Sequence, residues 1–127
     1  MKKILFMANS LGGGGAEKAL IDLLHHFDYS RYDVSLCLVF NEGCYLQDVP
    51  PEVKVFSLYG REWNFAHRKS LKLYRKHGIR ALLRLRARWK IRKHYDAIIS
   101  FIEGDALLFH DLVRDRAGRN IAWVHCD

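Results

Sequence analysis

A run of four glycines is the most unusual feature of this 127-residue chain. Gly12, Gly13, Gly14 and Gly15 separate a short apolar stretch from a helical pattern. Glycine lets backbone N–H groups approach a ligand closely, and the N-terminus of a helix carries partial positive charge. A tight strand-to-helix turn needs only one or two glycines, so four in succession favour a site for a diphosphate group.

The glycine run does not match the two common nucleotide-binding fingerprints. Started at Gly12 or Gly13, the dinucleotide pattern G-x-G-x-x-G places Glu17 or Lys18 where its third glycine belongs. The Walker A pattern is absent because no Gly-Lys-Ser/Thr follows the run. Both a dehydrogenase and an NTPase are therefore disfavoured.

Two acids and a histidine follow later apolar runs. Glu103 and Asp105 come after the run 97–101, and His125 comes after the run 121–124. All three are candidates to contact a ligand or its acceptor, with His125 as the candidate catalytic residue. Asp105 is equally suited to cap the helix that follows it, and capping is the role we favour for it. A single histidine at a strand end is otherwise a capping or solvated residue.

The elements that must position these residues alternate between strands and helices. Five apolar runs have the length of buried strands: 4–8, 34–40, 53–58, 97–101 and 121–124. Three segments have apolar residues at helical spacing: 16–27, 67–94 and 105–118, the last ending at the stop signal Gly118. The alternation predicts an α/β fold, a doubly wound, Rossmann-like three-layer sandwich with a mainly parallel sheet of about five strands. Its first and fourth strands should be neighbours.

Spacing also predicts which helix faces are buried. The first helix should bury Ala16, Ala19, Leu20, Leu23, Leu24 and Phe27. The second half of 67–94 has the apolar stripe Ile79, Leu82, Leu83, Leu85 and Trp89. The last helix should bury Leu108, Phe109, Leu112 and Val113.

The predicted topology brings the candidate residues together. In open parallel sheets, ligands bind beyond the carboxyl ends of the strands, where the strand order reverses. The glycine run, Glu103 with Asp105, and His125 all follow strands, so they should meet at this edge although more than a hundred residues separate the first from the last.

The net charge of +7 comes from one segment. Residues 61–94 contain thirteen Lys or Arg and one acid, whereas the rest of the chain has eight bases and thirteen acids. An arginine recurs at every fourth position: Arg80, Arg84, Arg88 and Arg92. Together with interleaved aromatic residues, this row favours an anionic membrane surface as a partner. A solvated face is the next interpretation, and nucleic acid comes last because no DNA- or RNA-binding motif accompanies the charge.

Composition excludes several other classes of protein. No apolar run approaches the roughly 20 residues that span a bilayer, and the apolar stretch near the N-terminus is too short for a signal peptide. Three cysteines without a C-x-x-C pair indicate a reduced, cytoplasmic protein, peripheral to the membrane if the basic segment binds one. Cys37, inside a strand, should be a small core residue. Residues 1–127 read as one domain, which we expect to be a fragment of a longer chain.

Several segments resemble the amino-terminal domain of GT-B-fold, retaining glycosyltransferases of family 4. The similar segments occur in that family's order and cover nearly the whole chain: Leu11–Leu20 (LGGGGAEKAL), Tyr45–Val55, Tyr95–Ser100 (YDAIIS) and Ile121–His125 (IAWVH). The resemblance implies two Rossmann-like domains facing a cleft, with the acceptor held chiefly by the amino-terminal one. It also implies transfer of a sugar from a nucleoside-diphosphate sugar to a glycan or lipid-linked acceptor, without an essential metal or other cofactor.

The resemblance assigns roles to some residues and leaves others out. It implies that Gly13 to Gly15 approach the donor diphosphate and that His125 lies near the transferred sugar, whereas Glu103 and Asp105 match only a loop location. The glutamate pair of the family's donor domain is missing, so these residues alone should be inactive. The alternative, from another class, is a non-catalytic Rossmann-type module that binds an anionic membrane or polymer.

Overall fold

The computed structural model describes residues 2–9, 11, 15–40, 45–59, 81–101 and 105–123. Within these ranges, five strands form one sheet: β1 (Lys2–Ala8), β2 (Tyr32–Phe40), β3 (Lys54–Tyr59), β4 (Tyr95–Phe101) and β5 (Ala117–Trp123). The strand order is β3-β2-β1-β4-β5, and every neighbouring pair is parallel. The predicted parallel sheet, with the first and fourth strands adjacent, is confirmed.

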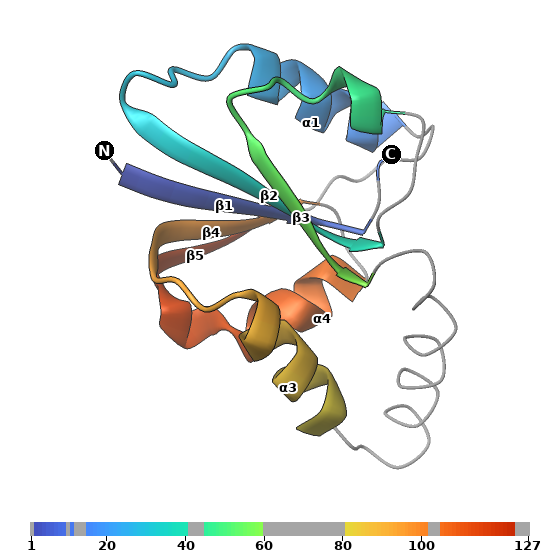
Figure 1. The fold of residues 1–127 in the computed structure, drawn as a ribbon, viewed down its shortest axis with the longest axis vertical. Helices are drawn as coiled ribbons and strands as arrows, with labels where there is room; N and C mark the ends of the chain where they lie inside the picture. Colours follow the sequence, from blue (N-terminus) through green and yellow to red (C-terminus); the bar gives the residue numbers. More distant parts are fainter. Residues whose placement is uncertain are drawn as a thin grey trace.

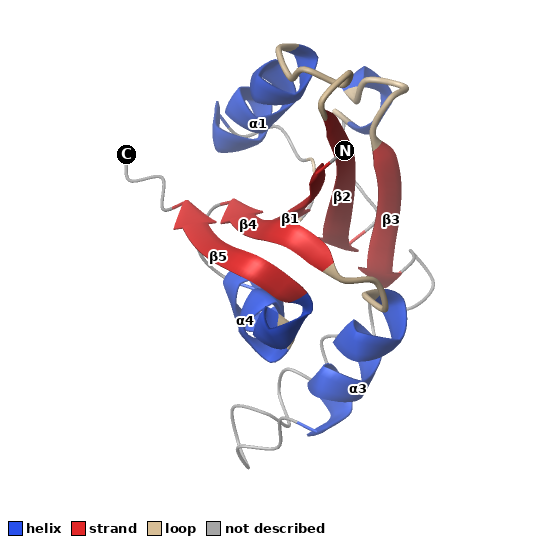
Figure 2. Ribbon diagram, turned by 90° about the vertical axis from the view of Figure 1, so that its left-hand side faces the viewer, coloured by secondary structure: helices blue, strands red, loops and turns tan. Residues whose placement is uncertain are grey.

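Helices cover both faces of this sheet, as Figures 1 and 2 show from two directions. Helix α1 (Gly15–His25) lies on one face, and α3 (Ala81–Lys90) and α4 (Asp105–Leu112) lie on the other. Short 3-10 turns occur at η1 (Leu46–Asp48) and η3 (Arg114–Arg116). The result is the predicted Rossmann-like α/β sandwich of three layers.

The central strand β1 is buried on both faces, as its uninterrupted apolar run predicts. Even-numbered residues from Ile4 to Ala8 belong to the core beneath α1. Leu5 and Met7 belong to the second core, beneath α3 and α4. Successive strand residues point to opposite faces, so a strand covered on both sides must be apolar at every position. Cys37 of β2 is buried in the second core, as predicted, and burial raises the pKa of its thiol.

The buried face of α1 differs in part from the predicted one. Leu20 and Leu24 are buried as expected, but Ile21 is buried and Ala19 is exposed. An isoleucine removes more apolar surface from water than an alanine does, so this rotation of the helix is favoured. At the end of the helix, Phe27 packs edge-on against Phe6 of β1, with 5.8 Å between ring centroids. The side chain of Ala16 lies outside the described part.

The region after α4 corrects a second prediction. The helix was expected to continue to Gly118, but α4 ends at Leu112 and β5 already begins at Ala117. Gly118 lies within this strand, where a Cβ atom would come 3.2 Å from the carbonyl oxygen of Asp96. The glycine therefore permits close approach of β5 to β4 rather than stopping a helix. Phe109, Leu112 and Val113 are buried as predicted, and the side chain of Leu108 is not described.

Helix α3 buries a different face from the predicted stripe. Leu85 and Trp89 are 70% and 51% exposed, whereas Ala87 and Ile91 are fully buried in the second core. Ala87 has a small side chain, which lets the helix backbone approach the sheet closely. The prediction is therefore wrong for Leu85 and Trp89. Ile79 and the side chains of Leu82 and Leu83 lie outside the described part.

Candidate functional site

The carboxyl ends of β1 and β4 lie side by side where the strand order reverses. Met7 and Ser100 are register partners, so the last residues of the two strands, Ala8 and Phe101, end at the same level. Both side chains are buried in the core beneath α1. This is the edge at which the topology predicts a ligand site.

The structure places both ends of the glycine run at this edge. Leu11 is fully buried in the same core, and its carbonyl oxygen accepts a hydrogen bond of 3.0 Å from the backbone N–H of Tyr45. Gly15 is the first residue of α1. Gly12, Gly13 and Gly14 lie outside the described residues and connect these two points. A glycine-rich connection into a helix N-terminus presents backbone amides and partial positive charge, which suits an anionic group.

The acids and the histidine follow strands that end at the same edge. Asp105 is the first residue of α4, just beyond β4, and only its backbone is described. Trp123, the last residue of β5, is paired with Phe101, so the two strands end at one level. Glu103 and His125 lie outside the described residues. The strands β1, β4 and β5 thus end at one edge, as the topology predicts, and the contacts of the candidate side chains there stay a prediction.

A buried hydroxyl near this edge was not singled out from the sequence. Ser100, the penultimate residue of β4, is 1% exposed, and its Oγ atom has no hydrogen-bond partner among the described residues. The sequence does give one indication that this residue is unusual: Ser100 is the single polar residue in the apolar run 97–101. An unpaired buried hydroxyl costs stability, so the hydroxyl of Ser100 is a locally destabilising feature of β4.

We expect Ser100→Ala to raise the free energy of unfolding by about 1 kcal/mol, because the variant removes a buried polar group that has no partner. Ser35 of β2 is the matched control: it is also buried, but it hydrogen-bonds the hydroxyl of Tyr95. Ser35→Ala should therefore lower the stability. Urea denaturation of both variants measures the difference, and a loss of stability in Ser100→Ala would show that its hydroxyl is satisfied.

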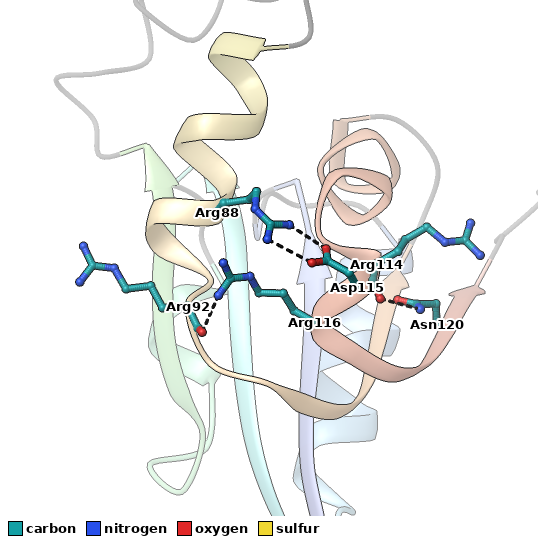
Figure 3. A network of polar contacts seen from close by, with 6 residues as sticks. All are labelled: Arg88, Arg92, Arg114, Asp115, Arg116 and Asn120. Atoms are coloured by element: carbon teal, nitrogen blue, oxygen red, sulfur yellow. Dashed lines mark hydrogen bonds and ion pairs between the residues drawn. The ribbon is translucent and has the colours of Figure 1, made fainter.

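The predicted arginine row lies away from this edge, and its members differ. Arg80 is outside the described residues, Arg84 and Arg92 are exposed, and Arg88 is half-buried. Figure 3 shows Arg88 of α3 facing Asp115 of η3, near the amino ends of β4 and β5. The two guanidinium nitrogens of Arg88 donate to the two carboxylate oxygens of Asp115 at 2.7 and 3.0 Å. This hydrogen-bonded pairing holds the pKa of Asp115 below its usual value.

Further contacts near the amino ends of these strands are structural. Arg116 donates from Nη1 to the carbonyl oxygen of Arg92 at 2.5 Å, which ties η3 to the segment after α3. His110 of α4 is buried and donates from Nε2 to Oδ1 of Asn120 at 2.8 Å. Asn120 in turn donates to the carbonyl oxygen of Arg114 at 3.1 Å (Figure 3). Burial lowers the pKa of His110, so it is a neutral link between α4 and β5.

The described ranges lack two other kinds of feature. There, no three His, Cys, Asp or Glu side chains are grouped so that they could hold a metal ion. No helix in the same ranges is long and apolar enough to cross a membrane. A scan against protein-family models and a search of curated proteins found no match to this chain.

Proposed function

We propose that this chain forms the acceptor-side domain of a nucleotide-sugar-dependent glycosyltransferase. One observation carries the proposal: the strand order of the parallel sheet reverses at β1, and the glycine run joins the end of β1 to the N-terminus of α1 at that reversal. A helix N-terminus reached through glycines suits a diphosphate. The resemblance of four segments to family 4 glycosyltransferases supports the same ligand class.

The proposed reaction exchanges one bond at the anomeric carbon of the donor sugar. The bond between that carbon and the diphosphate oxygen breaks, and the nucleoside diphosphate leaves with the electron pair. A hydroxyl oxygen of the glycan or lipid-linked acceptor forms the new bond, and the hydroxyl proton leaves to the diphosphate or to solvent. Negative charge therefore develops on the diphosphate as the reaction proceeds.

Stabilisation of that charge would be the main catalytic contribution of this domain. Preorganised backbone amides, such as those of a glycine run at a helix N-terminus, stabilise a developing anion without reorganising during the reaction. His125, which follows β5 at the same edge, would contact the transferred sugar or the acceptor. Glu103, which follows β4, would contact the diphosphate or the acceptor, and Asp105 would cap α4.

Titration of the isotope-labelled chain with nucleoside diphosphates and their sugar derivatives tests the proposal by NMR. We expect amide shifts to concentrate at Asn9, Leu11, Gly15 and Phe101, at the carboxyl edge. Asp115 at the amino edge is the internal control. The affinity should be no tighter than about 1 mM, because a ligand site usually buries most of its ligand and a partner domain would supply the rest.

The same samples test whether sugar transfer requires a second, donor-binding domain. We expect no sugar transfer by residues 1–127 alone, because the donor-binding glutamate pair is missing from them. Measurable turnover by this chain would contradict the two-domain proposal. An absence of shifts at the carboxyl edge, or shifts only at the amino edge, would contradict the proposed nucleotide site itself.

A further inference from the structure

We propose that α3 lies flat on an anionic membrane surface, with Leu85 and Trp89 entering the interface between headgroups and acyl chains. The proposal goes beyond sugar transfer and does not depend on it. It concerns the face of the domain that carries α3 rather than the edge that carries the glycine run. It keeps Arg84 and Arg92 of the four-arginine row, gives Arg88 a positioning role, and adds Leu85 and Trp89.

The orientation of α3 directs two apolar side chains into solvent. Ala87 and Ile91 are fully buried against the sheet. Successive helix residues are about 100° apart, so Leu85 and Trp89 lie on nearly the opposite side from this buried pair. They are 70% and 51% exposed and, being four residues apart, form one adjacent pair. An exposed leucine beside an exposed tryptophan is the apolar side of an interfacial helix.

Two polar contacts hold the helix in this orientation. Arg88 makes two hydrogen bonds to Asp115, and the carbonyl oxygen of Arg92 accepts one from Arg116 (Figure 3). Both contacts join the C-terminal half of α3, or the residues just after it, to η3. Arg88 therefore serves to position the helix, while Leu85 and Trp89 remain presented to the outside.

The segment that carries the exposed pair is rich in cations. Residues 81–94 contain six Lys or Arg and no Asp or Glu. Four of these cations are exposed in the structure: Arg84, Lys90, Arg92 and Lys93. Nζ of Lys90 and Cζ of Arg92 lie 4.8 and 5.8 Å from the ring centroid of Trp89. Cations next to an indole ring can contact lipid phosphates while the ring lies at headgroup depth.

These observations favour a membrane over a nucleic acid. Both partners would attract the cations, and a nucleic acid base could stack on Trp89. A phosphodiester backbone, however, offers nothing to Leu85, the more exposed of the two apolar residues. A lipid interface removes both apolar side chains from water and neutralises the cations at the same time.

Co-sedimentation of the 127-residue chain with vesicles tests this proposal. We expect binding to vesicles of phosphatidylcholine mixed with phosphatidylglycerol, little binding to pure phosphatidylcholine, and weakening by added salt. Leu85→Ser with Trp89→Ser should weaken binding at least about tenfold. Arg84→Gln with Lys90→Gln should weaken it roughly 25-fold, at about fivefold for each lost cation.

Matched control variants change exposed apolar or cationic side chains that lie away from α3. Val55→Thr removes part of an exposed apolar side chain on β3, and Lys18→Gln with Arg31→Gln removes two exposed cations near the opposite face. Both controls should bind within about twofold of the parent chain. All variants change exposed residues, and thermal unfolding verifies that each is folded.

Depth of insertion is measured separately with brominated lipids, which quench tryptophan fluorescence. We expect strong quenching in the parent chain and loss of most of it in Trp89→Phe, although that variant still binds. No binding to anionic vesicles at low salt, equal binding to neutral ones, unchanged quenching in Trp89→Phe, or binding to single-stranded DNA but not to vesicles would each overturn the proposal. Vesicle binding without any nucleotide-induced shift would contradict the transferase and leave the membrane surface intact.

Discussion

If the proposed function holds, we expect Gly14→Val to lower the sugar-transfer rate of the proposed two-domain transferase by roughly 10²- to 10³-fold, the usual cost of losing one preorganised donor to a developing anion. Gly14 belongs to the connection between buried Leu11 and the first residue of α1. A branched side chain there would obstruct close approach of the diphosphate to the backbone, and it would strain any positive φ angle. Steady-state kinetics at saturating and limiting donor measure the effect.

Ala19→Val is the matched control for Gly14→Val. Ala19 lies on the exposed side of α1, the helix that follows the glycine run, so a valine is introduced close in sequence but on the solvent side of the helix. We expect wild-type kinetics and a nearly unchanged melting temperature from this control. Wild-type kinetics in Gly14→Val as well would remove the glycine run from the donor site.

The second large effect concerns stability. We expect Phe109→Ala to lower the free energy of unfolding by about 3–5 kcal/mol, because it deletes a large, completely buried side chain. Phe109 packs from α4 into the core that also receives Leu5, Met7 and Ala87. Because a domain of this size has a net stability of about 5–15 kcal/mol, the variant should unfold at a much lower urea concentration.

Leu85→Ala is the control that separates the two possible faces of α3. Leu85 is mostly exposed, so its truncation should change the stability by no more than about 0.5 kcal/mol. Comparable losses in Leu85→Ala and Phe109→Ala would mean that α3 packs through the stripe that periodicity predicts. Urea denaturation of both variants in one buffer decides the question.

The observed orientation of α3 differs from the one that periodicity predicts, and it comes with polar contacts to a distant segment. Its sequence offers Leu85 and Trp89 on one side and Ala87 and Ile91 on the other, and apolar side-chain area alone favours burial of the first pair. Asp115 lies 27 residues from Arg88 in the sequence, and their ion pair exists only after η3 is placed beside α3. These contacts between distant segments accompany the observed orientation, and the exposed ion pair contributes little to it because solvent screens the two charges.

The edge of the sheet where a ligand site is expected could be predicted from the sequence, but not every residue near it could. Apolar runs mark where β1 and β4 end, and strand ends determine which loops meet, so the positions of Gly15 and Asp105 at one edge followed from topology. The buried hydroxyl of Ser100 did not follow. The sequence shows that a serine interrupts an apolar strand. Only the packed structure shows that none of the described residues forms a hydrogen bond with its hydroxyl.

The amino-acid sequence by itself determined the sheet: five apolar runs, with 4–8 and 34–40 buried on both faces, and an alternation with helices that favours parallel strands. These features are local, because a buried strand shows a continuous apolar run in its own residues. The tertiary structure alone decided the start of β5, the exposed face of α3 and the rotation of α1. Gly118 illustrates the reason: alone it reads as a helix stop, but beside the carbonyl oxygen of Asp96 it allows two strands to pair.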